Sequence, residues 1–146
     1  MREFATLFQA PSPAVLTTYR KDGTAVTPPV WFRFHRDTFE VVIAENDVKL
    51  RHLTARPECE LLVFETVPPF RGMRVRSDQP ILTQDGAQQA RQDIASRYLG
   101  EERGKRFVAE RTSSAILLRL PADHAKAWDL NAILPSQQRL SGRRVL

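Results

Sequence analysis

The chain has 146 residues, of which 42% are hydrophobic and 27% charged, a composition typical of one soluble globular domain with one core. No apolar run approaches the roughly 20 residues of a membrane-spanning helix, and the N-terminal segment lacks the long apolar region of a signal peptide. Cys59 is the only cysteine, which excludes an internal disulfide and a cysteine-cluster metal site. We therefore expect a cytoplasmic protein that does not associate with a membrane.

Basic residues outnumber acidic ones by 22 to 17, and 18 of the 22 are arginine. The planar guanidinium favours bidentate capture of phosphate or carboxylate. Arg139, Arg143 and Arg144 lie in the segment 137–146, which has no apolar period and is expected to form a flexible basic tail. The net charge of +5 therefore permits an anionic partner without requiring one.

The first part of the chain predicts a short helix followed by an antiparallel meander. An amphipathic helix is expected over residues 2–9, and Pro11 and Pro13 end it. The turns "KDG" and "HRD" are short enough to join antiparallel neighbours. The strands that they connect are rich in β-branched and aromatic residues and are expected at 14–20, 24–34 and 38–45.

The pattern then changes to a helix and two strands. A helix is expected to begin with Asn46 or Asp47 as its N-cap and to end before Pro57. The nearly continuous apolar run at 59–67 predicts a buried strand. Residues 71–83 predict a long strand with alternating basic and apolar side chains.

The last part predicts two helices and two further strands. Asp85 is expected to cap a helix that ends at Gly100, and a second helix is expected over 101–111. Final strands are expected at 113–120 and 124–130. Six to seven short antiparallel strands with peripheral helices predict a mainly β, α+β fold, arranged as a small barrel in a single domain over residues 1–146.

Two stretches in this order carry a family resemblance. "AVLTTYRKDGTAVTPPVWF", followed by "FEVVIAENDVKLRHLTARPECELLVF", resembles the flavin-binding split-barrel family of pyridoxamine 5′-phosphate oxidase. It is most similar to the branch of probable deazaflavin-dependent oxidoreductases, and the resemblance covers residues 14–129. It implies a split barrel and a homodimer with two cofactor sites at the subunit interface.

The resemblance also implies a cofactor site, with coenzyme F-420 (the deazaflavin coenzyme) or FMN as the cofactor. The ring would lie against the second strand, and the phosphate would lie at the start of the first long helix. By position, the implied cofactor-binding residues are Thr27, Pro28, Pro29 and Val30 along the ring, Lys49 at the phosphate, and Arg51 in the same basic patch.

The prolines at 28 and 29 have two interpretations. Proline cannot donate to a strand ladder, so the segment either borders a planar cofactor in place of a neighbouring strand or forms a bulge at a barrel edge. Lys49 has a physical rationale of its own, because an anion is favoured at a helix N-terminus. Asp47 departs from this pattern, since its carboxylate would repel phosphate; we expect it to cap the helix and to pair with Arg51.

No catalytic side chain or metal site is predicted. His35, His52 and His124 show no metal-ligand spacing, and no acid–base constellation is visible, which fits redox chemistry carried by a cofactor. The leading hypothesis is an oxidoreductase that passes a hydride between a flavin or deazaflavin and a small planar substrate. The alternatives are a non-catalytic flavin- or haem-binding protein and a basic module that binds nucleic acid or another polyanion. We expect no nucleic-acid partner, because the charge is scattered.

Overall fold

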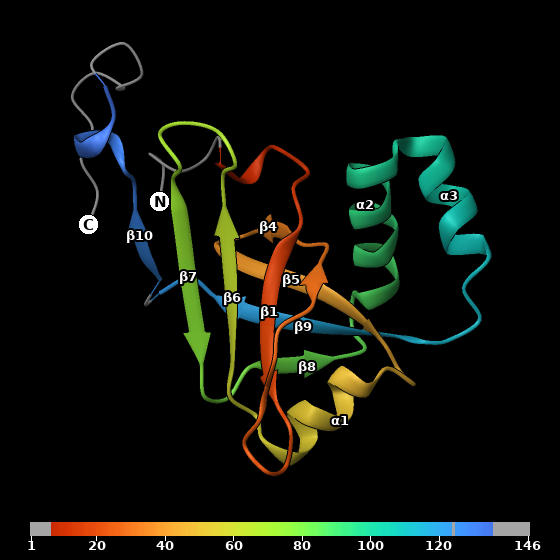
Figure 1. Cartoon of the computed structure of the whole chain (residues 1–146). Helices are drawn as coiled ribbons and strands as arrows, with labels where there is room; N and C mark the ends of the chain where they lie inside the picture. Colours follow the sequence, from red (N-terminus) through yellow and green to blue (C-terminus); the bar gives the residue numbers. More distant parts are fainter. Residues whose placement is uncertain (1–6, 124, 136–146) are drawn as a thin grey trace.

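A computed structural model describes residues 7–123 and 125–135 of the chain. Most of the N-terminal helix expected over 2–9, His124 and the tail 137–146 lie outside the described residues. The described elements (Figure 1) are β1 Ala14–Tyr19, β2 Ala25–Val26, β3 Pro29–Val30, β4 Arg33–His35, β5 Thr38–Ala44, α1 Val48–Ala55, β6 Cys59–Phe64, β7 Gly72–Ser77, β8 Ile81–Thr83, α2 Ala87–Leu99, α3 Glu101–Ala109, β9 Ala115–Pro121, β10 Lys126–Trp128 and the short 3-10 helix Asn131–Ile133.

The strands form two antiparallel sheets that do not close on each other. One sheet has the order β10-β7-β6-β1-β2, with β3 also paired to β1, and the other has the order β4-β5-β9-β8. The helices lie outside the sheets, with α2 and α3 together on one side (Figure 1). This arrangement is a split barrel with peripheral helices, which confirms the predicted fold class.

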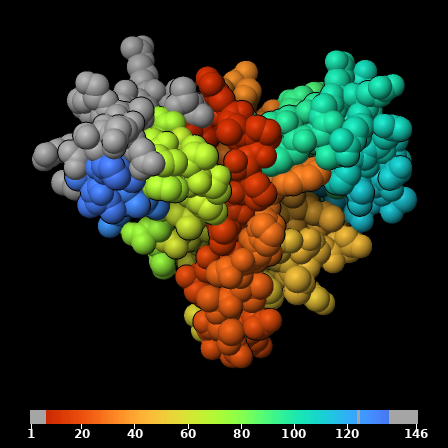
Figure 2. Space-filling view, turned by 45° about the horizontal axis from the view of Figure 1, so that its top comes forward, coloured from red at the N-terminus to blue at the C-terminus, as the bar shows by residue number. Residues whose placement is uncertain are grey.

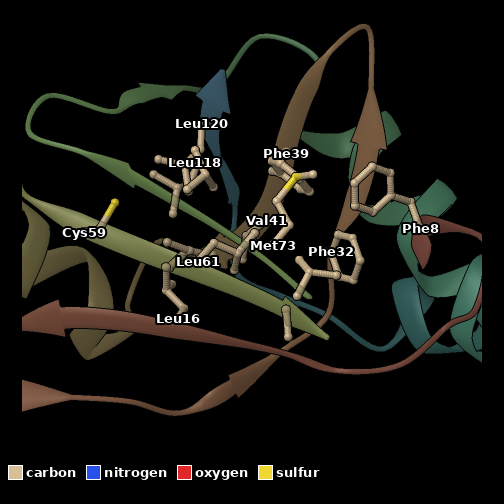
Figure 3. Packing of buried hydrophobic residues seen from close by; sticks show 14 of the residues in the cluster. Phe8, Leu16, Phe32, Phe39, Val41, Cys59, Leu61, Met73, Leu118 and Leu120 are labelled. Carbon is tan, nitrogen blue, oxygen red and sulfur yellow. The ribbon is translucent and has the colours of Figure 1, made fainter. Parts of the chain in front are cut away.

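The main core fills the space between the two sheets. Alternate residues of each strand face it, so β1 buries Ala14, Leu16 and Thr18 while the residues between them are half-buried. The close view in Figure 3 shows side chains from both sheets meeting in this core. Its fully buried large side chains include Leu16, Phe32, Phe39, Val41, Leu61, Met73, Leu118 and Leu120.

The second sheet is covered on its other face as well. Ala87 and Ala90 of α2 pack against Ala115 and Leu117 of β9, with Val42 of β5 beside them. These small side chains allow the helix to lie close to the sheet. Gly104 then allows α3 to lie close to α2, since a Cβ at this position would be 2.8 Å from the backbone nitrogen of Ser96.

The segment 24–34 is not one strand, because it passes from one sheet to the other. β2 and β3 pair with β1 in a single register, Thr18 opposite Val26 and Val15 opposite Pro29, whereas β4 pairs with β5 in the second sheet. Trp31 and Phe32 make the crossing. The prediction of one continuous strand is therefore wrong.

Pro28 and Pro29 do have a neighbouring strand. The backbone N–H of Leu16 donates to the carbonyl of Pro28 at 3.1 Å, so only the return bond is missing. Hydrogen-bonded and non-bonded pairs alternate along an antiparallel ladder. At position 29 the backbone nitrogen therefore faces away from β1, toward the open edge of the sheet, so the N–H that proline lacks costs no bond to β1. The prolines therefore lie at an edge of the sheet, as one interpretation proposed, but the unbroken register against β1 contains no bulge.

Two further boundaries differ from the sequence predictions. The expected long strand 71–83 is divided into β7 and β8, which lie in different sheets, and Pro80 stands just before β8. The N-cap of α2 is Gly86, with a φ of 74°, and not Asp85. The backbone N–H of Asp85 instead takes the hydroxyl of Thr83 as its acceptor at 3.0 Å.

Candidate functional site

A cleft of about 380 Å³ lies where β5, the start of α1, and the helices α2 and α3 meet the crossing segment. Figure 2 shows the teal α2–α3 pair on one side of the molecule, next to orange atoms of the N-terminal third of the chain. The cleft is lined by Pro29, Val30 and Trp31 of the crossing, Val41, Val42 and Ala44 of β5, Asp47 and Lys49 at the start of α1, Arg91, Ile94 and Ala95 of α2, and Phe107 and Arg111 at the end of α3.

The floor and one wall of the cleft are apolar. Trp31 stacks on Tyr98 of α2, with ring centroids 4.9 Å apart and an interplanar angle of 7°, and Phe107 lies 5.3 Å from the same indole. The Tyr98 hydroxyl accepts from the backbone N–H of Phe32 at 3.1 Å and donates to the carbonyl of Ser12 at 2.9 Å. These bonds fix α2 to the crossing, and with it the orientation of the aromatic wall.

The start of α1 brings a helix N-terminus and an ion pair to the cleft. Asp47 is the N-cap, and its carboxylate accepts from the backbone N–H of Lys49 at 2.8 Å, as the sequence predicts. The expected ion pair with Arg51 is wrong, because Asp47 pairs with the Lys49 ammonium at 3.1 Å. Burial opposes ionisation of Asp47, but the two hydrogen bonds from Lys49 outweigh it and hold the pKa of this carboxyl below its usual value.

Two arginines bring positive charge from the helical side. Arg91 is only 8% exposed, and its guanidinium donates to the carbonyl of Ser113 at 2.9 Å. Arg111 lies 3.9 Å above the ring of Phe107 and donates to the Phe107 carbonyl at 3.2 Å. Burial, and then repulsion from Arg111, hold the pKa of Arg91 below its usual value. Neither arginine pairs with a carboxylate of the described residues.

The structure brings three of the six predicted site residues together. Pro29, Val30 and Lys49 line the cleft. Thr27 and Pro28 lie beside β1 outside this lining, and Arg51 lines a separate hollow with Glu45, Leu50, Thr54 and Ala55. Arg51 is two residues after Lys49, and two residues rotate a helix by about 200°, so the two side chains do not share a basic patch.

The sequence analysis missed Arg91, Phe107 and Arg111 as site residues. A signal for Arg91 was present: it follows Ala87 by four residues and precedes Ile94 by three, which places a charged side chain on the apolar face of α2. Phe107 and Arg111 had no such signal, because only the packing of α3 against α2 brings them to the cleft.

The described residues contain neither a metal-ligand cluster nor a membrane-spanning helix. In the described part of the chain, no group of three or more His, Cys, Asp or Glu side chains could hold a metal ion. His35 is exposed, and His52 is bonded to the hydroxyl of Thr18 at 3.1 Å. Of the helices that the structure describes, none is long and apolar enough to cross a membrane.

Comparison with known proteins places the chain in a family. A family model described as pyridoxamine 5′-phosphate oxidase matches residues 1–129. The chain belongs to this family. A search of the curated proteins finds no match. The family assignment confirms the resemblance seen in the sequence, and members of this family bind FMN and related flavins.

Solved structures of the pyridoxamine 5′-phosphate oxidase family share the fold at low identity. A conserved hypothetical protein of Mycobacterium tuberculosis is 18% identical, with a TM-score of 0.75 over 92% of this chain and 88% of that one. An F420 reductase is 19% identical, with a TM-score of 0.62 over 80% and 90% of the two chains. HutZ, the haem storage protein of Vibrio cholerae, is 13% identical, with a TM-score of 0.61 over 85% and 91%.

The residues of the cleft fit a cofactor of the kind that the family binds. Apolar side chains of β5 and the flat rings beside them suit a planar aromatic group, whereas Arg91, Arg111 and the N-terminus of α1 suit a phosphate or carboxylate. Both kinds of surface occur in one cavity of a size typical for small-molecule sites. An F420 reductase and a haem storage protein share this fold, so the fold is compatible with both catalysis and cofactor storage.

Proposed function

We propose that the protein is an oxidoreductase that binds coenzyme F-420 or FMN in the cleft and transfers a hydride between this cofactor and a small planar organic substrate. The observation that carries the proposal is the combination, in one cleft, of an apolar floor, an aromatic wall and two arginines to which the described residues give no carboxylate partner. When bound, the isoalloxazine or deazaflavin ring supplies the hydride chemistry. The protein's own residues bind and orient it.

The roles of the cleft residues follow from their places. Pro29 and Val30 present the edge of the first sheet to the ring, and β5 supplies the floor. Trp31 is held by its stack on Tyr98, so it offers a fixed surface beside the ring or the substrate. Lys49 and the helix N-terminus behind it lie on the polar side of the cleft. Three residues that the resemblance implied, Thr27, Pro28 and Arg51, lie outside the cleft. They bind the cofactor only if it extends beyond the cleft.

Between the two cofactors, we propose coenzyme F-420 first and FMN second. FMN carries a single phosphate, whereas the deazaflavin coenzyme carries a longer acidic tail. The described residues give neither Arg91 nor Arg111 a carboxylate partner, and two such arginines offer more positive charge than one phosphate needs. The likeness to an F420 reductase, with a TM-score of 0.62, supports the fold, and the charge of the cleft supports the choice.

We also propose that the working form is a homodimer with cofactor sites at the interface. Three exposed apolar side chains support this: Val48 at the start of α1, and Ile81 and Leu82 on the edge strand β8, are 38–45% exposed. A second copy would cover such side chains and complete the open side of a cleft that one chain only partly encloses. The substrate is then a small molecule that approaches the ring from that side.

A cavity-filling substitution tests the location of the cofactor. Ala44 lines the floor of the cleft, so Ala44→Trp should abolish binding of FMN and F-420. Titration monitored by absorption spectroscopy measures this binding. Ala55→Trp is the matched control, since Ala55 is exposed at the end of α1 and lies outside the cleft. If Ala44→Trp binds either cofactor as tightly as the wild type while remaining folded, the cofactor does not occupy this cleft.

Turnover separates the enzyme from its alternatives. A reduced cofactor that is reoxidised catalytically by an added planar acceptor identifies an oxidoreductase. Tight binding of flavin or haem without turnover identifies a non-catalytic binding protein. Affinity for DNA that falls steeply with salt, together with no cofactor binding, identifies the polyanion-binding alternative.

A further inference from the structure

Arg91 is a buried charge without a counter-ion in the described structure. It is 8% exposed, and the carbonyl of Ser113 is the one acceptor that the described residues give to its guanidinium. Buried arginines are nearly always paired, because an unpaired charge loses its hydration without compensation. Arg91 is also one of the residues that line the cleft. A ligand that supplies negative charge there would therefore compensate Arg91.

Arg91 is connected through Ser113 to the turn before α1. The Ser113 residue that accepts from it also donates its hydroxyl to the side-chain carbonyl oxygen of Asn46 at 3.1 Å. This bond ties the loop after α3 to the turn before α1. The guanidinium is thus held near the N-terminus of α1, where the helix dipole adds positive potential.

Arg111 adds a second cation to the same cleft. Its guanidinium stacks on Phe107 and is anchored by the Phe107 carbonyl, so it is oriented without being neutralised. Burial, and after it repulsion from Arg111, hold the pKa of Arg91 below its usual value, so an anion between the two guanidinium groups would relieve both effects. Lys49 differs from both arginines, because Asp47 lies 3.1 Å from its ammonium and compensates its charge.

We propose that Arg91 and Arg111 together form the oxyanion site of the cleft and bind a phosphate or carboxylate group, in place of Lys49. Two guanidinium groups can give an oxyanion several charge-assisted hydrogen bonds. The oxyanion comes either from the cofactor or from an acidic substrate. That the cofactor supplies the oxyanion rests on the proposed function. That the two arginines bind an oxyanion does not depend on it.

The first test compares ligands with and without a phosphate. FMN and riboflavin are titrated into the wild type, Arg111→Ala and Arg91→Met, which keeps the apolar stem of the side chain. We expect each variant to bind FMN about 10- to 150-fold more weakly, as for the loss of a charged hydrogen bond, and to bind riboflavin as the wild type does. Arg106→Ala, at an exposed position on α3 outside the cleft, should change neither the FMN affinity nor the riboflavin affinity. Unchanged FMN affinity in Arg111→Ala overturns the cofactor as the source of the oxyanion.

The second test works even if no flavin binds. Inorganic phosphate should raise the melting temperature of the wild type and of Arg106→Ala, and should raise that of Arg111→Ala much less. Equal protection of all three proteins overturns the oxyanion site. If Arg91→Met fails to fold, Arg111→Ala decides alone, since Arg111 is exposed at the rim.

Competition identifies the source of the oxyanion. Inorganic phosphate that displaces F-420 or FMN shows that the cofactor's own acidic group occupies the arginine pair. Phosphate that binds together with the cofactor shows that the pair is reserved for an acidic substrate. Phosphate protection that depends on Arg111, without any cofactor binding, keeps the oxyanion site and rejects the proposed cofactor.

Discussion

At the scale of single residues, the site depends on which charges are already compensated. Lys49 and Arg91 line one cleft and carry the same charge. Lys49 forms an ion pair with Asp47, whereas among the described residues Arg91 is bonded to the backbone carbonyl of Ser113 and to no carboxylate. Sequence position alone favoured Lys49, because it stands in the first turn of a helix. The structure shows that the nearest carboxylate neutralises it.

Asp47→Asn tests this difference. Asparagine caps helices about as well as aspartate, so α1 should keep its start, while Lys49 loses its partner and the cleft loses a negative charge. We expect FMN, or phosphate, to bind about two- to fivefold more tightly, in the range of a partly exposed ion pair. Titration calorimetry measures this change. Asp85→Asn, an exposed position outside the cleft, is the control, and weaker binding by Asp47→Asn would contradict the expectation.

A second residue-scale prediction concerns acid stability. Glu65 and Arg71, which are mostly buried, pair at 2.7 Å, and the side-chain hydrogen bond from Arg71 holds the pKa of Glu65 below its usual value despite burial. Because the folded pKa is lower than the unfolded one, near 4.3, this pair stabilises the protein above that pH. The stabilisation is lost as the pH falls through the folded pKa.

Glu65→Gln should therefore be less stable than the wild type at pH 7 and should lose less stability on acidification. Urea unfolding at pH 7 and at about pH 3.5 measures both differences. An equal loss in the two proteins on acidification would show that Glu65 is not the group that titrates. Glu102→Gln, an exposed substitution in the first turn of α3, controls for the general effect of removing a carboxylate.

At the scale of elements, the walls of the cleft depend on close helix packing. α3 reaches the cleft only because Gly104 lets it approach Ser96 of α2, and this approach carries Phe107 and Arg111 to the rim. Tyr98 holds α2 to the crossing segment through two hydrogen bonds. The site is therefore assembled by helix–helix and helix–strand contacts and not by a single motif.

Gly104→Ala should disturb this assembly. The new Cβ would meet backbone atoms of Ser96 at 2.8 Å, which cannot rotate away, so α3 must shift. We expect a loss of about 1–3 kcal/mol in the free energy of unfolding, the usual cost of overpacking, together with weaker binding of the cleft ligand. Chemical denaturation measures the first effect and titration the second. Arg103→Ala, at the exposed neighbouring position, should change neither.

At the scale of the whole molecule, two open sheets leave edges and apolar side chains for another chain to cover. β2 and β3 form an edge of the first sheet, and β4 and β8 are the edges of the second. The exposed side chains of Ile81 and Leu82 stand on one of these edges. These open edges and exposed side chains support the proposed homodimer.

We predict a homodimer in solution at micromolar concentration. Ile81→Lys and Leu82→Lys in one variant should weaken the dimer, because they would place two charges on the edge strand β8 in place of exposed apolar side chains. Light scattering on a dilution series measures the mass. A wild type that is monomeric with its cofactor bound would contradict the prediction, and a variant that dimerises normally would place the interface elsewhere.

The sequence by itself determined the local order of the fold and the family. The content of β-branched and aromatic residues predicted β1 and β5, the cap at Asn46 or Asp47 predicted α1, and two motifs in order predicted the split barrel. Only the tertiary structure decided that the segment 24–34 crosses between sheets and that Arg91 and Arg111 share a cleft. The physical reason is range: caps and strand periods are set by residues within about four positions, whereas the charge balance of a cleft is set by residues distant in sequence, such as those of α1, α2 and α3.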